Sequence, residues 1–420
     1  MLNKLKFLSA FPLLLLFLMP FEALAEEATT GQIAGDNAWM LTSTCLVLLM
    51  TIPGVALFYG GLSRKQNVLS TLMHVFAGCC VVTLTWCIIG YSIAYTEGTT
   101  AYFGGLGNFM FNGFEIAEKD YSGLPIGVDV VFQATFAIIT TALIAGSFAE
   151  RIKFSSTLVF MAIWSVVVYA PVCYWVWGGG VLSEKGILDF AGGTVVHINC
   201  GIAGLVAAIV VGKRTSDSYT WAPHNLIYTL VGASLLWVGW FGFNAGSSWA
   251  ADRLAGMAML VTHISAATAA FTWMSIEWIK GGKPTLVGIA TGMVAGLATI
   301  TPAAGSVGPE GALLIGLMAG IICFYATQAV KGLFGIDDSL DVFPVHGVGG
   351  IIGIIMVSFV GVQGGFLGSS AGETWLPMEQ FLIQLKGILV IGLWTAIASW
   401  IILKLPGLLT PLRVTEEEEL

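Results

Sequence analysis

Eleven long apolar segments constrain the fold of this 420-residue chain more than any other feature. Each is close to the roughly 20 residues that an α-helix needs to cross the hydrocarbon core of a bilayer. Only 10% of the residues are charged, against about 25% in soluble domains. The segments are centred near residues 48, 82, 137, 166, 202, 234, 267, 294, 320, 357 and 391. We therefore predict an all-α polytopic membrane protein with eleven transmembrane helices.

The first 25 residues are predicted to form a cleaved signal peptide. The basic segment MLNKLK precedes the apolar run FLSAFPLLLLFLMPF, and Ala23, Leu24 and Ala25 match the small-residue cleavage rule. The alternative is a first membrane helix, but the run is short for a span and ends in A-x-A. This division leaves a membrane domain over residues 26–410 and a short cytoplasmic tail over residues 411–420. A mature N-terminus outside the cytoplasm suggests a Gram-negative source.

Basic residues are distributed unequally between alternate loops. If the mature N-terminus lies outside, the external loops contain only Lys119, Lys185 and Arg253. The cytoplasmic loops then contain Arg64, Lys65, Arg151, Lys153, Lys213, Arg214, Lys280, Lys283, Lys331, Lys404 and Arg413. Because cytoplasmic loops are enriched in Lys and Arg, this bias predicts an external N-terminus and a cytoplasmic C-terminus. No basic stripe or arm indicates a nucleic-acid partner.

Two apolar segments carry a central histidine. GGTVVHINCGIAGL holds His197 in span five, and DVFPVHGVGGIIGII holds His346 in span ten. Asp189 precedes the first histidine by eight residues and Asp341 precedes the second by five, so both acids are expected to cap the helix starts. Two copies of five spans each must have opposite orientations. We predict an inverted 5+5 repeat plus a final helix, with the two rings meeting near the midplane.

The paired histidines favour a function over a purely structural role. Two neutral rings can share one N–H···N hydrogen bond, which suits a small neutral polar molecule or a proton relay better than an alkali cation. The alternative for any single buried histidine is a hydrogen-bonded structural residue, and His74, His224 and His263 are interpreted in that way. The seven cysteines lie in apolar runs without CxxC spacing and are interpreted as small packing residues. We expect no metal, no cofactor and no enzymatic nucleophile–base pair.

Aromatic residues near the predicted outer helix ends suggest a site for a cation. Trp177 precedes three glycines, which leave the indole face open, and such a face attracts a cation by about 0.5–2 kcal/mol. Ser247, at the outer end of span six, can accept a hydrogen bond from an N–H cation. Phe132 and Phe136 share a helix face at i and i+4, where phenyl rings would form a water-poor constriction. The alternative for most of the 14 Trp residues is an interfacial belt.

Six motifs, in order across nearly the whole mature chain, resemble the ammonium transporter/Rh family. They are DNAWMLTSTCLVLLMTIPGVALFYGGL, AERIKFS, WGGGVL, LDFAGGTVVHIN, GWFGFNAGS and DVFPVHGVGGIIG. The bacterial ammonium transporter branch is the more similar one, since Trp177 and Ser247 are both present. The residue roles that the resemblance implies are ammonium recruitment for Trp177, Ser247, Phe132 and Asp189, a gate for Phe136 and Phe243, and a pore and proton relay for His197 and His346.

The resemblance also implies how such a protein works. Ammonium would be recruited outside, deprotonated and conducted as ammonia, with coupled proton transfer that makes uptake electrogenic. Homotrimers in the bacterial inner membrane, with one pore per subunit and a cytoplasmic PII signalling protein as a partner, are further implications. Two alternatives are an ammonium sensor, which a fused signalling domain would favour, and an electroneutral ammonia channel, which loss of the Trp177/Ser247 pair would favour.

Overall fold

The computed structural model describes residues 21–98, 100–115, 123–215, 222–361, 377–409 and 411–419. Residues 1–20, which hold most of the predicted signal peptide, lie outside the described residues. The first described helix, α2, runs from Phe21 to Leu49 and includes the proposed cleavage point. Cleavage after Ala25 therefore stays a prediction.

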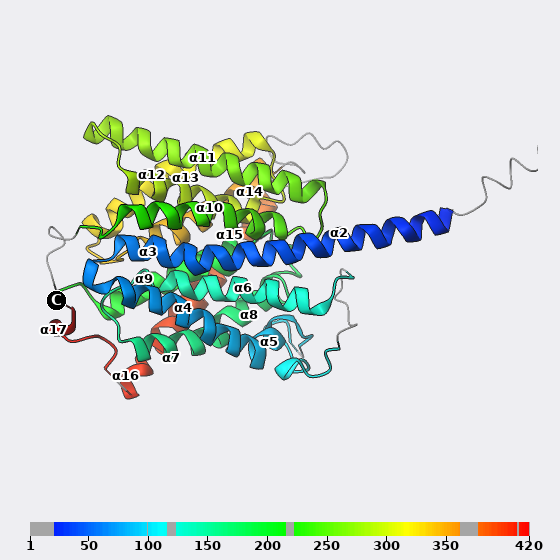
Figure 1. The fold of residues 1–420 in the computed structure, drawn as a ribbon, viewed down its shortest axis with the longest axis horizontal. Helices are drawn as coiled ribbons and strands as arrows, with labels where there is room; N and C mark the ends of the chain where they lie inside the picture. The colour runs from blue at the N-terminus through cyan, green and yellow to red at the C-terminus, as the bar shows by residue number, and fades with distance from the viewer. Residues whose placement is uncertain are drawn as a thin grey trace, which may run out of the picture.

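Eleven helical spans lie side by side through the described molecule (Figure 1), as the apolar segments predict. In the labels used here, η marks a π-helical or 3₁₀-helical segment. Spans one to five are α2, η1 (Met50–Val55) and α3 (Ala56–Leu62); α4 (Val68–Thr85), η3 (Trp86–Gly90) and α5 (Tyr91–Tyr95); α6 (Ile126–Ile144); α7 (Phe154–Trp164), η5 (Ser165–Tyr169) and α8 (Ala170–Val176); and η6 (Gly193–Ile198) with α9 (Asn199–Val211).

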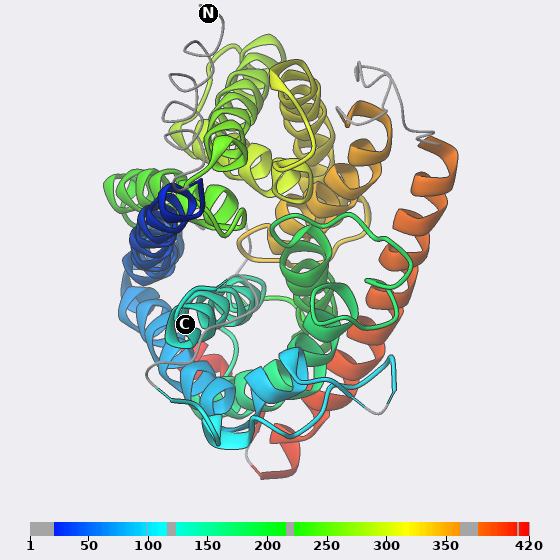
Figure 2. The same cartoon turned by 90° about the vertical axis from the view of Figure 1, so that its right-hand side faces the viewer.

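The remaining spans complete the second repeat and add one peripheral helix. They are α10 (Leu226–Gly246); α11 (Arg253–Gly281); α12 (Leu286–Ile300) with η8 (Thr301–Ala303); α13 (Pro309–Gln328) with η9 (Ala329–Leu333); η10 (Phe343–Gly347) with α14 (Val348–Val360); and α15 (Pro377–Lys404). Viewed along the helix axes, spans one to five lie mainly in the lower part of the bundle and spans six to ten mainly in the upper part (Figure 2). The last span, α15, packs against α9 and α14, one helix from each half.

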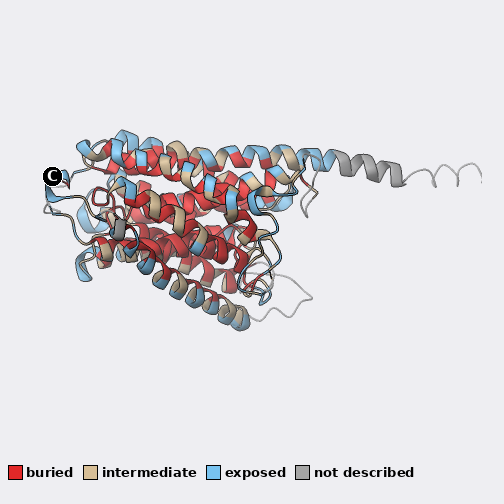
Figure 3. Cartoon of the chain, turned by 90° about the horizontal axis from the view of Figure 1, so that it is seen from below, coloured by how far each residue is buried: buried red, intermediate tan, exposed pale blue. Residues whose placement is uncertain are grey.

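Burial follows the pattern expected of a bundle in lipid. Buried residues fill the interior, whereas exposed residues lie along the outer helices and at their ends (Figure 3). Large apolar side chains are exposed on the periphery, for example Leu69 and Phe76 on α4, Phe271 on α11 and Leu393 on α15. Such a surface is unfavourable in water and is stable against acyl chains, so the fold is that of a multi-pass membrane protein.

The two histidine-bearing helices meet through glycines. A Cβ atom on Gly201 of α9 would lie 2.3 Å from the backbone of Gly347, which directly follows His346. Only glycines allow two backbones to approach so closely in a membrane bundle. Both histidines lie in π-helical segments, η6 and η10, and π-helical turns are frequent at functional sites. The matched helices support the inverted repeat.

One detail of the predicted repeat is wrong. Asp338, not Asp341, corresponds to Asp189, since it also lies eight residues before its histidine. The fully buried Asp338 accepts the backbone N–H of Phe343 at 2.8 Å and so caps η10, whereas Asp341 forms an ion pair with Lys331 at 2.8 Å. Burial and the neighbouring Asp341 carboxylate raise the pKa of Asp338 to about 6.

The end of the bundle opposite to Trp177 is tied together by arginines. The buried Arg151 donates to the carbonyl oxygens of Gly212, Ser147 and Asp337, the last at 2.8 Å. Arg214 forms a bidentate pair with Asp337 at 2.7 and 2.9 Å. Burial alone would raise the pKa of Asp337, but the hydrogen bonds and charges of Arg214 and Arg151 lower it to about 2. Loops that follow spans three, five and nine are therefore fixed to one another.

The predicted tail also packs on this end. The backbone N–H of Lys153 donates to the Leu412 carbonyl at 3.0 Å, and that of Val414 donates to the Arg151 carbonyl at 2.9 Å. Glu419 accepts hydrogen bonds from Arg413 at 2.7 Å and from the Thr215 backbone at 2.6 Å. Residues 411–419 thus join the same end of the bundle as the loops after the odd-numbered spans.

Candidate functional site

A cavity of about 420 Å³ opens at the end of the bundle where α8 ends and η6 begins. Four residues that the sequence singles out line it: Phe132, Phe136, Trp177 and Ser247. Tyr95, Gln133, Val176, Gly178, Phe190 and Trp249 complete its wall. Side chains from α6 and from the C-terminal ends of α8 and α10 therefore converge on one vestibule.

The indole of Trp177 is held in place by a backbone hydrogen bond. Its Nε1–H donates to the carbonyl oxygen of Asp189 at 2.8 Å, and its ring meets Phe136 edge-on, with centroids 5.9 Å apart. Because the polar edge of the ring is occupied by Asp189, the indole contributes its π face and its carbon edges to the cavity. This arrangement suits cation–π attraction.

The Asp189 carboxylate serves the helix start and does not line the cavity. Its Oδ1 accepts the backbone N–H groups of Gly192 at 2.9 Å and Gly193 at 2.5 Å. Its Oδ2 accepts the N–H groups of Thr194 at 2.7 Å and Val195 at 3.2 Å, and also the Thr194 hydroxyl. Five donors satisfy both oxygens, so this buried acid caps η6 while its carbonyl orients Trp177.

Ser247 and Gln133 supply hydrogen-bond acceptors to the vestibule. The Ser247 hydroxyl donates to the Phe243 carbonyl at 2.8 Å, which commits its proton and leaves its oxygen free to accept. The Oε1 atom of Gln133 is buried without a hydrogen-bond partner among the described residues. A guest that donates N–H bonds would satisfy both oxygens, whereas a potassium ion has no hydrogen to donate.

Two phenyl rings form the floor of the vestibule. Phe136 of α6 and Phe243 of α10 stack with centroids 4.1 Å apart and ring planes 16° apart, and both are about 1% exposed or less. Phe132 meets Phe136 edge-on at 5.0 Å. The stack stands between the cavity and the histidines, because Phe243 also contacts His197, with centroids 6.1 Å apart. A hydrated ion cannot pass the rings in this position.

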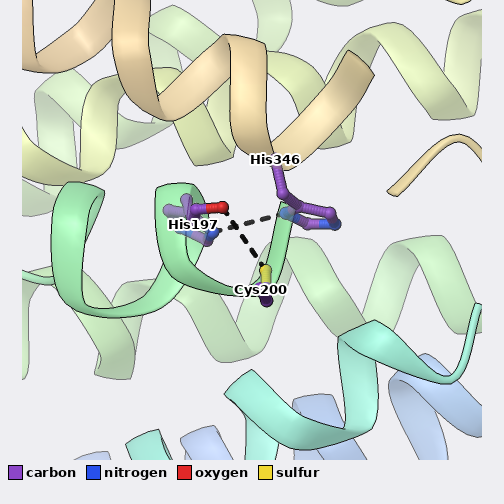
Figure 4. Close-up of side chains that lie close together, drawn as sticks. All are labelled: His197, Cys200 and His346. Atoms are coloured by element: carbon purple, nitrogen blue, oxygen red, sulfur yellow. Dashed lines mark hydrogen bonds between the residues drawn. The ribbon is translucent and has the colours of Figure 1, made fainter. Parts of the chain in front are cut away.

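The two histidine rings lie behind the phenyl stack, since Phe243 contacts His197. His197 in turn lies beside His346 (Figure 4). The Nδ1 atoms of His197 and His346 are 3.3 Å apart, and the rings are nearly parallel, with planes 20° apart. Trp240 also stacks on His197, with centroids 5.4 Å apart, and donates its indole N–H to the Thr301 hydroxyl. Both histidine side chains are buried, with exposed fractions of 1% for His197 and 4% for His346.

A second, smaller cavity of about 90 Å³ follows on the other side of the pair. Its wall includes His346 and Tyr59, and it extends to Ser339, Lys331 and Asp341 at the opposite end of the bundle. The Tyr59 hydroxyl donates to the Leu143 carbonyl at 3.1 Å. The described residues thus form, in order, the cavity at the Trp177 end (here named the outer cavity), a phenyl stack, two histidines and the cavity toward Asp341 (here named the inner cavity).

Several lining residues were not predicted from the sequence. Tyr95, Phe190 and Trp249 belong to the vestibule, and Trp240 supports His197. Trp240 could have been found from its spacing, because it lies three residues before Phe243 on the same helical face. Trp249 and Phe190 come from loops, where residue spacing carries no such signal.

A multi-pass bundle of inverted repeats with a buried route between two cavities defines a membrane transporter or channel, a class distinct from enzymes. The model of the Ammonium Transporter Family matches residues 38–420. The chain belongs to the ammonium transporter family.

Individual relatives agree with this assignment. An ammonium transporter of Aquifex aeolicus is 46% identical over 95% of this chain and 93% of its own, and one of Bacillus subtilis is 44% identical over 92% and 95%. The crystal structure of Saccharomyces cerevisiae Mep2 is 34% identical, with a TM-score of 0.83, and covers 91% of this chain and 90% of that chain. A sensor Amt protein is 27% identical, with a TM-score of 0.85, over 93% and 97%.

Proposed function

We propose that this transporter recruits ammonium in the outer cavity and conducts ammonia past the histidine pair. The observation that carries the proposal is the unbroken series of ring contacts from Trp177 through Phe136 and Phe243 to His197 and His346. The cation rests against the Trp177 face and donates to Ser247 and Gln133. Asp189 acts indirectly, because its carboxylate caps the start of η6 and its backbone carbonyl accepts the indole N–H of Trp177.

Deprotonation follows from the cost of carrying charge past the phenyl stack. A bare cation among Phe136, Phe243 and Trp240 would lose its hydration without gaining a carboxylate, which is strongly unfavourable. Neutral ammonia loses far less hydration and can exchange hydrogen bonds with the imidazole edges. The proton passes separately along the two histidines, so each ammonium carries one charge inward. Such coupling gains about 2.3 kcal/mol per charge per 100 mV of membrane potential.

Charge coupling predicts a current after an ammonium jump. We expect purified protein in proteoliposomes to give a transient inward current that scales with the ammonium step and is absent with a potassium step. The flux to compare with this current is the uptake of methylammonium, measured as a function of pH and of membrane potential. Undiminished flux without current would contradict the proton relay and favour the electroneutral channel, and absence of flux would favour the sensor.

Trp177→Leu should weaken recruitment without closing the pore. Loss of about 0.5–2 kcal/mol of cation–π attraction corresponds to a roughly 2-fold to 30-fold higher half-saturating ammonium concentration. The maximal current should change less, since the phenyl stack and the histidines remain. Trp278→Leu, an exposed tryptophan on α11, is the matched control. An unchanged half-saturation in Trp177→Leu would refute the recruitment role of the indole.

The assembly and location are proposed on family membership. We infer a homotrimer in a bacterial inner membrane, with the Trp177 end outside, as the loop charges indicate. The opposite end contains the loops that the arginines hold together, and also the tail. A cytoplasmic PII protein that bound there would contact the surface around Arg214 and Arg413, which form hydrogen bonds with Asp337 and Glu419. Ammonium and ammonia are the transported species in this proposal.

A further inference from the structure

A cysteine lies beside the two pore histidines. Cys200 follows His197 by three residues and so lies on the same face of the helix, with its Sγ 3.5 Å from the His197 carbonyl oxygen (Figure 4). The thiol and the two imidazoles each offer one donor atom, and these three atoms lie within 4.8 Å of one another. No second group of this kind, with three or more His, Cys, Asp or Glu ligands, is found in the described part of the chain.

The spacing of the two nitrogens matches a metal site. For zinc, whose bonds to histidine nitrogens are about 2.0–2.1 Å long, a tetrahedral angle places two nitrogens about 3.3–3.4 Å apart. The Nδ1 atoms of His197 and His346 are 3.3 Å apart. An ion bound by both Nδ1 atoms takes the place of the shared proton, which moves to the Nε2 atom of the ring that carried it. Only the Cys200 thiol must turn away from the carbonyl that it contacts.

Charge selects the kind of ion. Cys200 is fully buried, and the histidines are 1% and 4% exposed, so a net charge among them would be unfavourable. A metal-bound cysteine is a thiolate. One thiolate, two neutral imidazoles and a monovalent ion form a neutral unit, whereas a divalent ion leaves one positive charge. Thiolate and imidazole ligands also suit soft ions and not potassium, which prefers oxygen.

We propose that His197, Cys200 and His346 form a binding site for a soft monovalent metal ion of the Cu(I) and Ag(I) class, and that the bound ion blocks the pore. The inner cavity gives access, since it is lined by His346 and reaches Ser339 and Asp341 at the end of the bundle. The ion occupies the nitrogens that the proton relay uses. Blockage rests on the proposed function, whereas binding of the ion does not.

Silver binding tests the site directly. Two chains are compared, one in which Cys200 is the only cysteine left and one in which Cys200 is also replaced by Ser. In chloride-free detergent buffer we expect one Ag(I) per chain in the first and none in the second. X-ray absorption at the silver edge should show sulfur and nitrogen neighbours together. Equal silver content in the two chains, or neighbours that are sulfur alone, would overturn the site.

Inhibition tests the blockage in chains that keep their other cysteines. Each variant's ammonium current is normalised to its own silver-free value, so that failure of transport itself is seen separately. We expect the half-inhibitory silver concentration to rise at least ~10-fold in Cys200→Ser, because the soft ligand is lost. Cys323→Ser, the matched change at another fully buried cysteine, should respond like the parent. Identical inhibition of both variants, or silver bound without inhibition, would overturn the blockage.

Discussion

Asp189→Ala is expected to abolish transport and to lower the stability of the fold. The substitution leaves four backbone N–H groups and the Thr194 hydroxyl without their acceptor, all at a buried helix start. Loss of an N-cap side chain costs about 0.5–2 kcal/mol, and a buried donor left without an acceptor costs about 1–3 kcal/mol. Because η6 carries His197 and the Asp189 carbonyl anchors Trp177, loosening this turn displaces both ends of the pathway. Thermal unfolding in detergent and ammonium currents in proteoliposomes measure the two effects.

Asp341→Asn is the matched control for this prediction. Asp341 also precedes a pore helix, but it pairs with Lys331 and does not cap η10, so its loss should leave the unfolding temperature nearly unchanged. The unfolding temperature of Asp189→Asn should fall between those of Asp189→Ala and Asp341→Asn, because the amide NH₂ of the asparagine would face N–H donors on one side of the cap. An Asp189→Ala protein with the parent's unfolding temperature and current would contradict the capping account.

His346→Ala is expected to remove the charge-coupled flux. The variant retains His197, the phenyl stack and the outer cavity but loses the second half of the Nδ1–Nδ1 hydrogen bond. Without a continuous relay, we expect the ammonium current to fall by about 100-fold or more, as for the loss of a general acid–base group. If water fills the vacated space, the pore instead conducts potassium, and the selectivity of the remaining current detects this.

His263→Ala provides the control for His346. His263 is exposed on α11, against Trp237 and Phe241, and takes no part in the pathway. Its replacement should leave the ammonium current and its selectivity over potassium unchanged. If His346→Ala also kept the parent's rate and selectivity, the histidine pair would have no role as a proton relay.

The span count, the repeat and four of the ten residues that line the vestibule could be predicted from the sequence. Hydropathy averaged over 20 residues is robust to local detail, and the matched histidines of spans five and ten revealed the inverted halves. Trp177 and Ser247 were found because a tryptophan beside glycines and a serine at a helix end are local features. These signals need no knowledge of how distant segments pack.

The details that the sequence left open depend on contacts between segments or on backbone geometry. The sequence predicts Asp341 as the cap of span ten, since it lies near the helix start, but a π-helical start at Phe343 brings Asp338 into range. Cys200 was interpreted as a packing residue, and only the approach of His346 from the other half makes it part of a cluster. Residues on loops, such as Trp249, join the vestibule through tertiary packing alone.

The contact between Gly201 and Gly347 has a mechanical consequence. With no side chain between them, the two backbones are in direct contact at the point where the two halves of the molecule cross. A rocking motion of one half against the other would have to separate these two glycines. Sliding of one histidine-bearing helix along the other by one turn would bring larger residues into the contact. The spacing of the two histidine-bearing helices is therefore set by their backbones and not by side chains.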